Sequence, residues 1–243
     1  MMDKPKPQTT TLLQVFAAPN VTAGSVRVFW RNYIRGQRPK KVHALDVSLP
    51  PDCDDPCVVG ECVALNYLLL TKEILGPNRS GINLHLVVSK GAIRKLMLQK
   101  TMKPHVRRYA GFLQTRFADA GIHVEKNCDV WITYLREPVE LVSYHVCKEG
   151  TIETTQGAMC LTIHAVQRFA ERIGMRDMSR AWQRLSSMLS GCELTKTRPT
   201  ARYLKDARYK EATLYRFMYG SSSIVAVVVT EDGWQKIVTL YFV

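Results

Sequence analysis

The sequence predicts an α/β amino-terminal domain followed by a small α+β carboxy-terminal domain in which two helices precede an antiparallel sheet. Strand-like and helix-like patterns alternate over roughly the first 147 residues, and the order then changes to two helices and several strands. A polar, glycine-bearing stretch separates these two parts. We therefore expect a flexible lead, an α/β domain, a linker and an α+β domain, at residues 1–24, 25–147, 148–158 and 159–243.

The amino-terminal domain is expected to contain both strands and helices. Alternating apolar residues or short apolar runs predict strands at 25–36, 40–51, 82–89, 122–135 and 139–147. Longer, mostly apolar or amphipathic segments predict helices at 61–75, 90–100 and 103–121. Few polar residues interrupt the run 82–89, so we expect this strand in the centre of the sheet.

The carboxy-terminal domain is expected to begin with a helix over about 164–173. Gly174 ends this helix, and Asp177 or Ser179 can cap a second one that runs to Gly191. Four strand-like runs follow, at 201–209, 212–220, 222–234 and 235–243. The Asp-Gly pair in "EDGW" predicts a hairpin between the last two runs.

The first helix of this domain carries a polar stripe. Residues four apart lie on nearly the same helix face, so His164, Arg168 and Arg172 are expected to line up. Imidazole serves as acid or base near neutral pH, and a guanidinium can hold two phosphate oxygens. This set suits metal-independent RNA cleavage, in which the 2′-hydroxyl is the nucleophile. A basic, solvated helix face with acidic partners is the alternative.

The last strand can complete such a site. Because strand side chains alternate, Thr239 and Tyr241 share one face, and we expect them to point toward the same edge as the helix stripe. Both residues are also common in strands without any functional role.

The pattern "ITxHAxxRFxER", the two helices and the ending "DGWQKIVTLYF" resemble the RelE/ParE-like toxin domains of the barnase–EndoU–colicin–RelE ribonuclease assemblage. The resemblance covers about residues 160–243. It implies catalytic roles for five residues, His164, Arg168, Arg172, Thr239 and Tyr241. The amino-terminal half lies outside that compact toxin domain.

The charge of the chain favours a polyanionic partner. Lys and Arg number 34 against 21 Asp and Glu, which gives a net charge of +13. Nucleic acid is the commonest such partner, and a membrane surface is the next. We expect nucleic-acid contacts from two basic clusters and two strand residues, namely Arg31, Arg35, Arg38, Lys40, Lys41, Arg107, Arg108, Arg202 and Arg216. Solvated basic surfaces are the alternative.

Asp46 and Glu61 resemble the acidic pair of an RNase H-like fold, in which carboxylates bind two Mg²⁺. Ser89 stands where that family places an aspartate, so a degenerate RNase H-like scaffold, or another α/β scaffold, is expected. Cys53, Cys57 and Cys62 lack the second ligand pair of a zinc site. With seven cysteines and no signal-like segment, we expect reduced thiols in a cytoplasmic protein.

The sequence therefore predicts a toxin-type endoribonuclease that needs no cofactor or metal and leaves 2′,3′-cyclic phosphate ends. Its expected partners are RNA or another nucleic acid and a protein such as an antitoxin, with no membrane. The alternative is a non-catalytic nucleic-acid-binding protein, or a subunit of a larger ribonucleoprotein or defence assembly.

Overall fold

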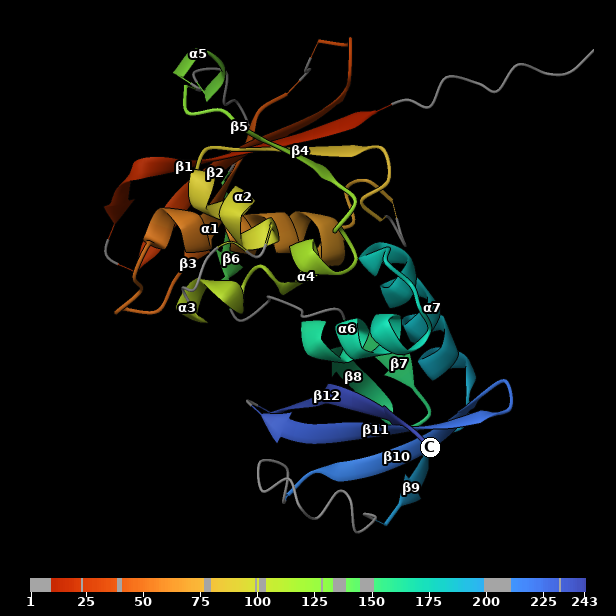
Figure 1. Ribbon diagram of the computed structural model, residues 1–243. Helices are drawn as coiled ribbons and strands as arrows, with labels where there is room; N and C mark the ends of the chain where they lie inside the picture. Colours follow the sequence, from red (N-terminus) through yellow and green to blue (C-terminus); the bar gives the residue numbers. More distant parts are fainter. Residues whose placement is uncertain are drawn as a thin grey trace, which may run out of the picture. The chain divides into compact units, whose positions relative to one another are not determined.

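The fold is described from a computed structural model, whose chain divides into two compact units (Figure 1). The first unit comprises residues 1–113 and 117–147, and the second comprises 114–116 and 148–243. The structure describes residues 10–22, 24–38, 41–76, 80–98, 100, 104–127, 129–132, 139–144, 151–198, 211–231 and 233–243. The predicted class, an α/β part followed by a small α+β part, is confirmed.

A six-stranded mixed sheet forms the centre of the first unit, in the order β5-β4-β1-β2-β3-β6. Strands β1, β2 and β3 pair antiparallel, whereas β4 is parallel to β1, β5 to β4 and β6 to β3. The strands span Thr11–Thr22 (β1), Ser25–Ile34 (β2), His43–Ser48 (β3), Leu84–Val88 (β4), Gly121–Val124 (β5) and Glu140–Ser143 (β6). The predicted strand 82–89 is β4, and it lies inside the sheet as expected.

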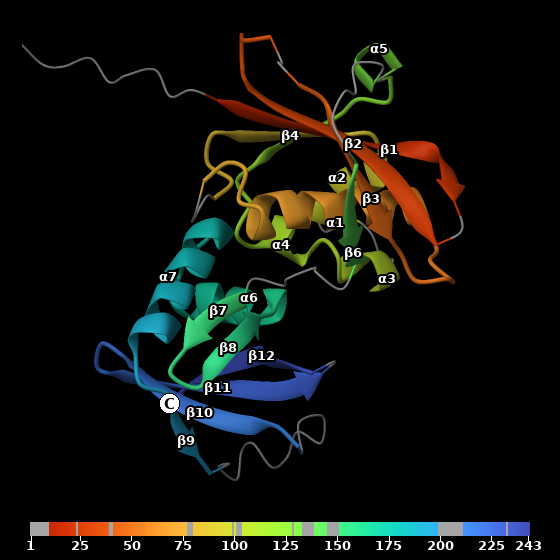
Figure 2. The same cartoon turned by 180° about the vertical axis from the view of Figure 1, so that it is seen from behind.

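Helix α1 (Pro56–Asn66) packs on one face of this sheet (Figure 2). Pro56 suits the first turn, because N–H groups there have no helical acceptor and proline has no N–H. The helix continues as a π-helix, η1 (Tyr67–Thr71). The whole helical segment therefore runs from Pro56 to Thr71, and it begins and ends earlier than the predicted 61–75. Helix α2 (Gly91–Met97) lies on the same face, and the core there includes Val28, Leu45 and Leu65, all with 0% exposure.

Two predicted elements of the first unit are wrong in extent. The predicted helix 103–121 is two single turns, α3 (Pro104–Arg107) and α4 (Gly111–Gln114). The predicted strand 122–135 is the short strand β5 followed by one helical turn, α5 (Asp129–Ile132), which covers the face opposite α1.

The predicted flexible lead 1–24 is also wrong for its second half, because β1 is an internal strand. Leu13, Val15 and Ala17 are buried on the α1 side of the sheet. The segment from Leu12 to Ala17, apolar except for Gln14, is the signal that predicts a strand here. Residues 1–9 lie outside the described residues.

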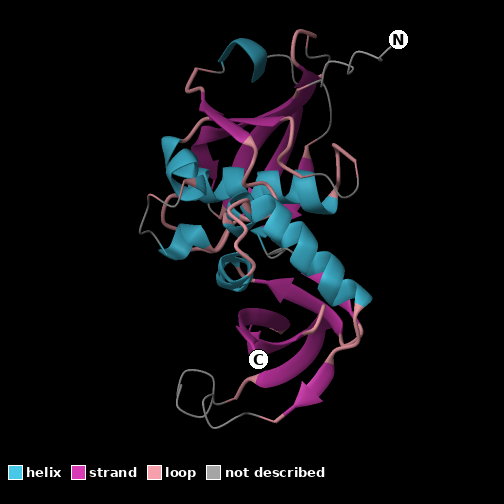
Figure 3. Ribbon diagram, turned by 45° about the vertical axis from the view of Figure 1, so that its right-hand side comes forward, coloured by secondary structure: helices cyan, strands magenta, loops and turns pink. Residues whose placement is uncertain are grey.

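The second unit is a six-stranded sheet in the order β7-β8-β12-β11-β10-β9, with its two helices on one face (Figure 3). Strands β8 and β12 are parallel, and all other neighbours are antiparallel. The elements span Thr151–Thr154 (β7), Gly157–Leu161 (β8), Ile163–Arg172 (α6), Met178–Gly191 (α7), Thr195–Thr197 (β9), Thr213–Tyr219 (β10), Ser222–Glu231 (β11) and Trp234–Phe242 (β12).

The two helices are capped largely as the sequence predicts. Gly174 has φ +67°, a conformation that favours glycine at a helix end. The Asp177 side chain accepts a hydrogen bond from the Arg180 N–H, so Asp177 is the residue that caps α7. Thr162 caps α6 in the same way, which the prediction missed. The predicted β11–β12 hairpin is confirmed.

The predicted linker 148–158 is wrong, because β7 and the start of β8 form a hairpin that belongs to the second unit. This hairpin adds two strands that precede the helices, so the sheet is larger than the three or four strands expected. Few large apolar residues mark the segment, which is why it resembles a linker in the sequence. The predicted strand 201–209 lies outside the described residues.

Candidate functional site

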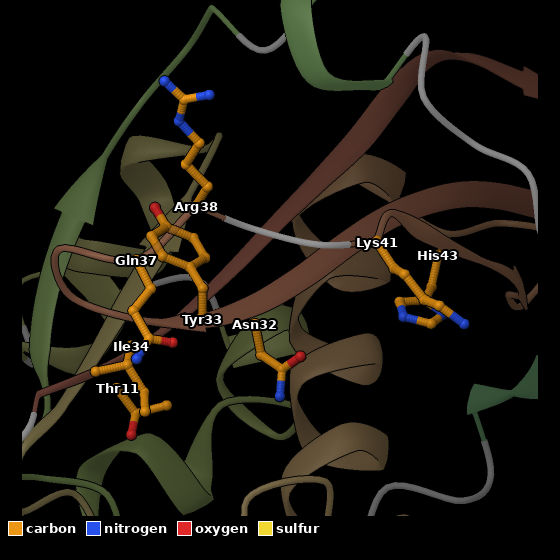
Figure 4. Close-up of a pocket in the computed structure, with 8 residues that line it drawn as sticks. All are labelled: Thr11, Asn32, Tyr33, Ile34, Gln37, Arg38, Lys41 and His43. Atoms are coloured by element: carbon orange, nitrogen blue, oxygen red, sulfur yellow. The ribbon is translucent and has the colours of Figure 1, made fainter.

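A cavity of about 350 Å³ lies at the end of the β2–β3 hairpin, beside the start of β1 (Figure 4). Polar, basic and aromatic side chains line it: Thr11, Asn32, Tyr33, Ile34, Gln37, Arg38, Lys41 and His43. In Figure 4, Tyr33 and Gln37 lie toward one side, and Lys41 and His43 lie toward the other. A pocket of this size is at the lower end of the range for small-ligand sites.

Backbone pairing fixes the shape of this hairpin end. Thr11 of β1 pairs with Ile34, the last residue of β2. The Arg35 N–H donates to the Thr10 carbonyl over 2.8 Å, and the Gln37 N–H donates to the Ile34 carbonyl over 2.9 Å. Gly36 completes the turn with φ +88°, which only glycine adopts without strain. The cavity is therefore built on paired strands and a defined turn.

The hairpin carries more positive than negative charge, and its one acidic residue on β3, Asp46, pairs with Arg27. Residues 25–45 contain six Lys or Arg and no Asp or Glu. Arg35, Arg38 and Lys41 are exposed. These three members of the predicted basic cluster are therefore at the surface. Two of them, Arg38 and Lys41, line the cavity. Lys40 lies outside the described residues.

Two aromatic rings line the cavity as well. The His43 ring stacks on Trp30, with ring centroids 4.2 Å apart and planes 16° from parallel. Trp30 is 5% exposed, so the imidazole rests on a buried platform. The Arg31 guanidinium lies 5.5 Å from the centroid of the Tyr33 ring. These contacts restrict both rings before any ligand binds.

Arg31 differs from its basic neighbours, because it takes part in the packing of the first unit. Its Nε donates to the Gln14 side chain over 2.8 Å, and Gln14 Nε2 donates to Glu125 over 2.9 Å. The Arg31 guanidinium also lies 4.6 Å from the Trp131 ring centroid. It therefore joins β2 to β1 and α5, and it is only partly exposed.

The remaining predicted nucleic-acid contacts do not join the cavity lining. Arg107 and Arg108 are exposed near α3, where Arg108 donates to the Tyr109 hydroxyl over 2.8 Å. Arg216 is exposed on β10 of the second unit. Arg202 lies outside the described residues.

Glu61 forms a second polar site, in the interior of the first unit. It has 0% exposure, and its carboxylate accepts hydrogen bonds from the Ala17 N–H over 2.9 Å and the Ser89 N–H over 3.0 Å. The Ser89 hydroxyl also donates to it. Burial raises the pKa of Glu61, while these hydrogen bonds lower it to a smaller extent. The carboxylate links the middle of β1 and the end of β4 to α1.

Asp46 is not part of this site, so the predicted acidic pair is wrong. The Asp46 carboxylate binds the Arg27 guanidinium through two hydrogen bonds of 2.8 and 2.7 Å. The hydrogen bond from Arg27 lowers the pKa of Asp46. Its strand neighbours Leu45 and Val47 face the core beneath α1, so Asp46 points to the opposite sheet face. The expected strand end and helix start suggested a pairing that strand alternation prevents.

Within the residues that the structure describes, no three His, Cys, Asp or Glu side chains lie close enough together to hold a metal ion. Cys62 is buried in the core, and the Cys57 thiol donates to the Ala18 carbonyl over 3.5 Å. The three neighbouring cysteines therefore act as packing residues. Among the described residues, cysteines 53, 57, 62, 160 and 192 form no disulfide.

The α6 stripe is present as predicted. His164, Arg168 and Arg172 are exposed, while Val166 and Phe169 on the other side of the helix are fully buried. Arg168 forms a 3.1 Å ion pair with Glu171, the acidic partner expected for a solvated helix face. The stripe consequently faces away from the sheet of its own unit.

Thr239 and Tyr241 do not meet this stripe, because a β-bulge shifts the register of β12. The shift lies between Val227 and Val228 of β11. Beyond it, Thr239 pairs with Val227 and Tyr241 with Val225, and these valines form a cluster separate from the one beneath α6. The two hydroxyl residues therefore lie on the sheet face opposite the helices.

Cross-strand pairing gives Tyr241 a different basic neighbour. Val225 pairs with Tyr241 on one side and with Arg216 on the other, so the three share one face of the sheet. Thr239 is 4% exposed, which leaves its hydroxyl largely out of reach of a ligand. The five predicted catalytic residues thus form two separate groups and not one site.

Sequence reasoning missed five residues of the hairpin cavity, Thr11, Asn32, Ile34, Gln37 and His43. Asn32 and Gln37 lie within the basic segment and could have been found there as amide hydrogen-bonding groups. Thr11 and His43 reach the cavity only through the pairing of β1 and β3 with β2. Their contribution depends on strand register, which the sequence does not state.

No protein-family model matches the chain, and no curated protein sequence matches it either. Three solved structures are similar to about half of it. RNase H1 from the halophilic archaeon Halobacterium salinarum NRC-1 is 11% identical, with 55% of this chain and 84% of that chain covered and a TM-score of 0.35.

The other two are also RNase H structures. LC11-RNase H1 in complex with an RNA/DNA hybrid is 10% identical, with coverage of 48% and 85% and a TM-score of 0.38. The amino-terminal RNase H domain of a Mycobacterium tuberculosis protein is 10% identical, with coverage of 52% and 88% and a TM-score of 0.34. None of the three is a RelE/ParE-like toxin, so that resemblance stays a prediction.

No helix among the described residues is both long and apolar enough to cross a membrane. The cytoplasmic location stays a prediction from the sequence.

Proposed function

We propose that this protein binds nucleic acid through the end of the β2–β3 hairpin. The observation that supports this most directly is the cavity there, which combines cationic, amide and aromatic side chains. Arg38 and Lys41 supply charge for phosphate groups, and Tyr33 and His43 supply rings. Few other ligands require all of these groups together.

Electrostatics supports the same proposal. The net charge of +13 attracts a polyanion, and the hairpin segment 25–45 contains six Lys or Arg, of which Arg27 is paired with Asp46. The exposed Arg35 adds a cation beside the cavity. We therefore place the first phosphate contacts at Arg35, Arg38 and Lys41.

The first unit would act as a binding module in this proposal. Its buried carboxylate, Glu61, already accepts hydrogen bonds from two backbone N–H groups and one hydroxyl. Asp46 is held by Arg27 on the other sheet face. These two carboxylates accordingly serve the fold, and we assign catalysis to neither.

Metal-independent RNA cleavage at α6 is the second candidate. The observation that favours it is the exposed stripe of His164, Arg168 and Arg172 on one helix face. Thr239 and Tyr241 lie elsewhere, so cleavage would depend on the three stripe residues alone. An antitoxin-like protein partner belongs with this candidate only.

The binding proposal is tested by fluorescence anisotropy with a labelled oligonucleotide of mixed sequence at several salt concentrations. Replacing Arg38 and Lys41 together by Ala should weaken binding and make the salt dependence shallower, because each lost phosphate contact reduces the slope by about 0.7–0.9. The matched control is Arg94→Ala with Lys95→Ala, which removes two exposed charges from α2. Equal losses in both double variants would contradict a specific role for the hairpin.

Incubation with total RNA in EDTA separates the two candidates. Fragments with cyclic phosphate ends that disappear in His164→Ala would support the ribonuclease. Intact RNA that still binds the protein would support the binding module.

A further inference from the structure

The hairpin cavity contains groups that a nucleic-acid duplex cannot fully use. Phosphates are available on any nucleic acid, but the faces of paired bases are covered by their stacked neighbours. Tyr33 and His43 nevertheless line the cavity with rings, and Asn32 and Gln37 line it with amides. This combination leads us to infer that the cavity accepts one unpaired base, so that the preferred ligand is single-stranded nucleic acid. The inference rests on the proposed function.

The aromatic residues fit this role because their positions are restricted in advance. His43 stacks on the buried Trp30, and Tyr33 lies on β2 with the Arg31 guanidinium 5.5 Å from its ring centroid. A base can stack on the side of the Tyr33 ring away from Arg31. Little side-chain freedom is then lost on binding, which favours affinity.

The amides fit the edge of a base. An amide side chain offers both a donor and an acceptor, and the exposed edge of an unpaired base needs both. Asn32 lies on the same sheet face as His43, opposite Tyr33, whereas Gln37 lies toward the Tyr33 side of the cavity in Figure 4, so each ring has an amide on its own side. A base stacked on one ring would thus have a hydrogen-bonding group close to its edge.

The cations complete the arrangement. Arg38 and Lys41 line the same cavity, so they can hold the phosphates on either side of the inserted base. The cavity volume of about 350 Å³ suits a single base and is small for a base pair. One nucleotide per cavity is the expected occupancy.

The test compares the binding of the intact chain to four labelled 12-mers by fluorescence anisotropy. These are a mixed-sequence DNA strand, its RNA equivalent, the DNA strand annealed to its complement, and an abasic DNA strand with the same phosphates. We expect the two ordinary single strands to bind about 10-fold or more tightly than the duplex and the abasic strand. The ratio of RNA to DNA affinity shows which sugar the site prefers.

A pair of variants tests the stacking directly. Tyr33→Ala should lower single-strand affinity about 10-fold and leave duplex affinity unchanged, whereas Tyr33→Phe should keep both, because the ring remains. The comparison of ordinary and abasic strands needs no variant, so it holds even if Tyr33→Ala fails to fold.

The outcomes separate this inference from the proposed function. Equal binding of ordinary, abasic and duplex DNA, lost in the Arg38 and Lys41 double variant, would overturn base insertion and keep nucleic-acid binding. Failure to bind all four oligonucleotides would overturn both.

Discussion

The first unit contains two polar sites, and they use charge in opposite ways. Glu61 is fully buried, and protein donors surround its carboxylate. The hairpin cations Arg35, Arg38 and Lys41 are exposed. The comparison teaches that burial decides whether a charged side chain is available to a ligand. Sequence alone does not distinguish the two sites, because both contain charged side chains.

The largest effect is expected from removing the buried charge. Glu61→Ala leaves the N–H groups of Ala17 and Ser89 without their acceptor, which should lower the free energy of unfolding by about 2–5 kcal/mol. Urea denaturation measures this loss. Ser89→Ala is the matched control, and it should cost about 1 kcal/mol because only one hydroxyl donor is lost. A Glu61→Ala variant as stable as the parent would show that the site is not structural.

The pH dependence of stability sharpens the comparison. Burial raises the pKa of Glu61 above its ordinary 4.5, so the folded protein holds this proton more tightly than the unfolded chain does. The stability contribution is fully present below pH 4.5 and is lost as the pH rises through the folded-state pKa. The stability of the parent relative to Glu61→Gln should therefore fall with rising pH. A constant difference would contradict the raised pKa.

A smaller effect is expected at the exposed site, and on binding alone. Arg35→Ala should weaken oligonucleotide binding about 2- to 5-fold at low salt, since one phosphate contact is lost, and should leave the unfolding free energy within about 0.5 kcal/mol. Anisotropy titrations and urea denaturation measure the two quantities on the same sample. A large stability loss with unchanged affinity would show that Arg35 stabilises the fold and does not contact the nucleic acid.

The smallest effect is expected at the partly exposed ion pair. Asp46→Asn removes the bidentate contact with Arg27 and should cost about 0.5 kcal/mol, as is usual for surface pairs. Arg27 lowers the pKa of Asp46, so the contribution is present above the ordinary pKa of 3.8 and is lost as the pH falls through the folded-state value. This sign is opposite to that of Glu61. Thermal unfolding of parent and variant at pH 3 and pH 6 would detect a reversed trend.

Much of the fold was predictable because local patterns decide it. Alternation marks β2, the continuous apolar run marks β4, and Gly174 and Asp177 mark the boundary between α6 and α7. The hairpin β7–β8 was missed because its segment has few large apolar residues, and its place in the sheet is set by the pairing of β8 with β12, more than 70 residues away. Strand β1 was missed although its apolar run was visible.

The candidate site residues also divide into those that local sequence predicts and those that depend on strand pairing. The basic segment around Arg35 and Arg38 could be found from composition, and α6 from helical spacing. The side on which Thr239 and Tyr241 lie could not, because the bulge in β11–β12 changes the alternation. Asp46 and Glu61 were linked by their expected places at the end of a strand and the start of a helix, while strand alternation turns Asp46 to the sheet face opposite α1.

The order of the second sheet has a consequence for how this unit assembles during synthesis. Strand β12 is the last of these strands to leave the ribosome, yet it lies between β8 and β11. The hairpin β7–β8 and the strands β9–β11 have no other hydrogen-bonded connection within the sheet. The strand pairing at the centre of this sheet therefore forms only after residues 234–242 emerge, which makes completion of the sheet a late step of synthesis.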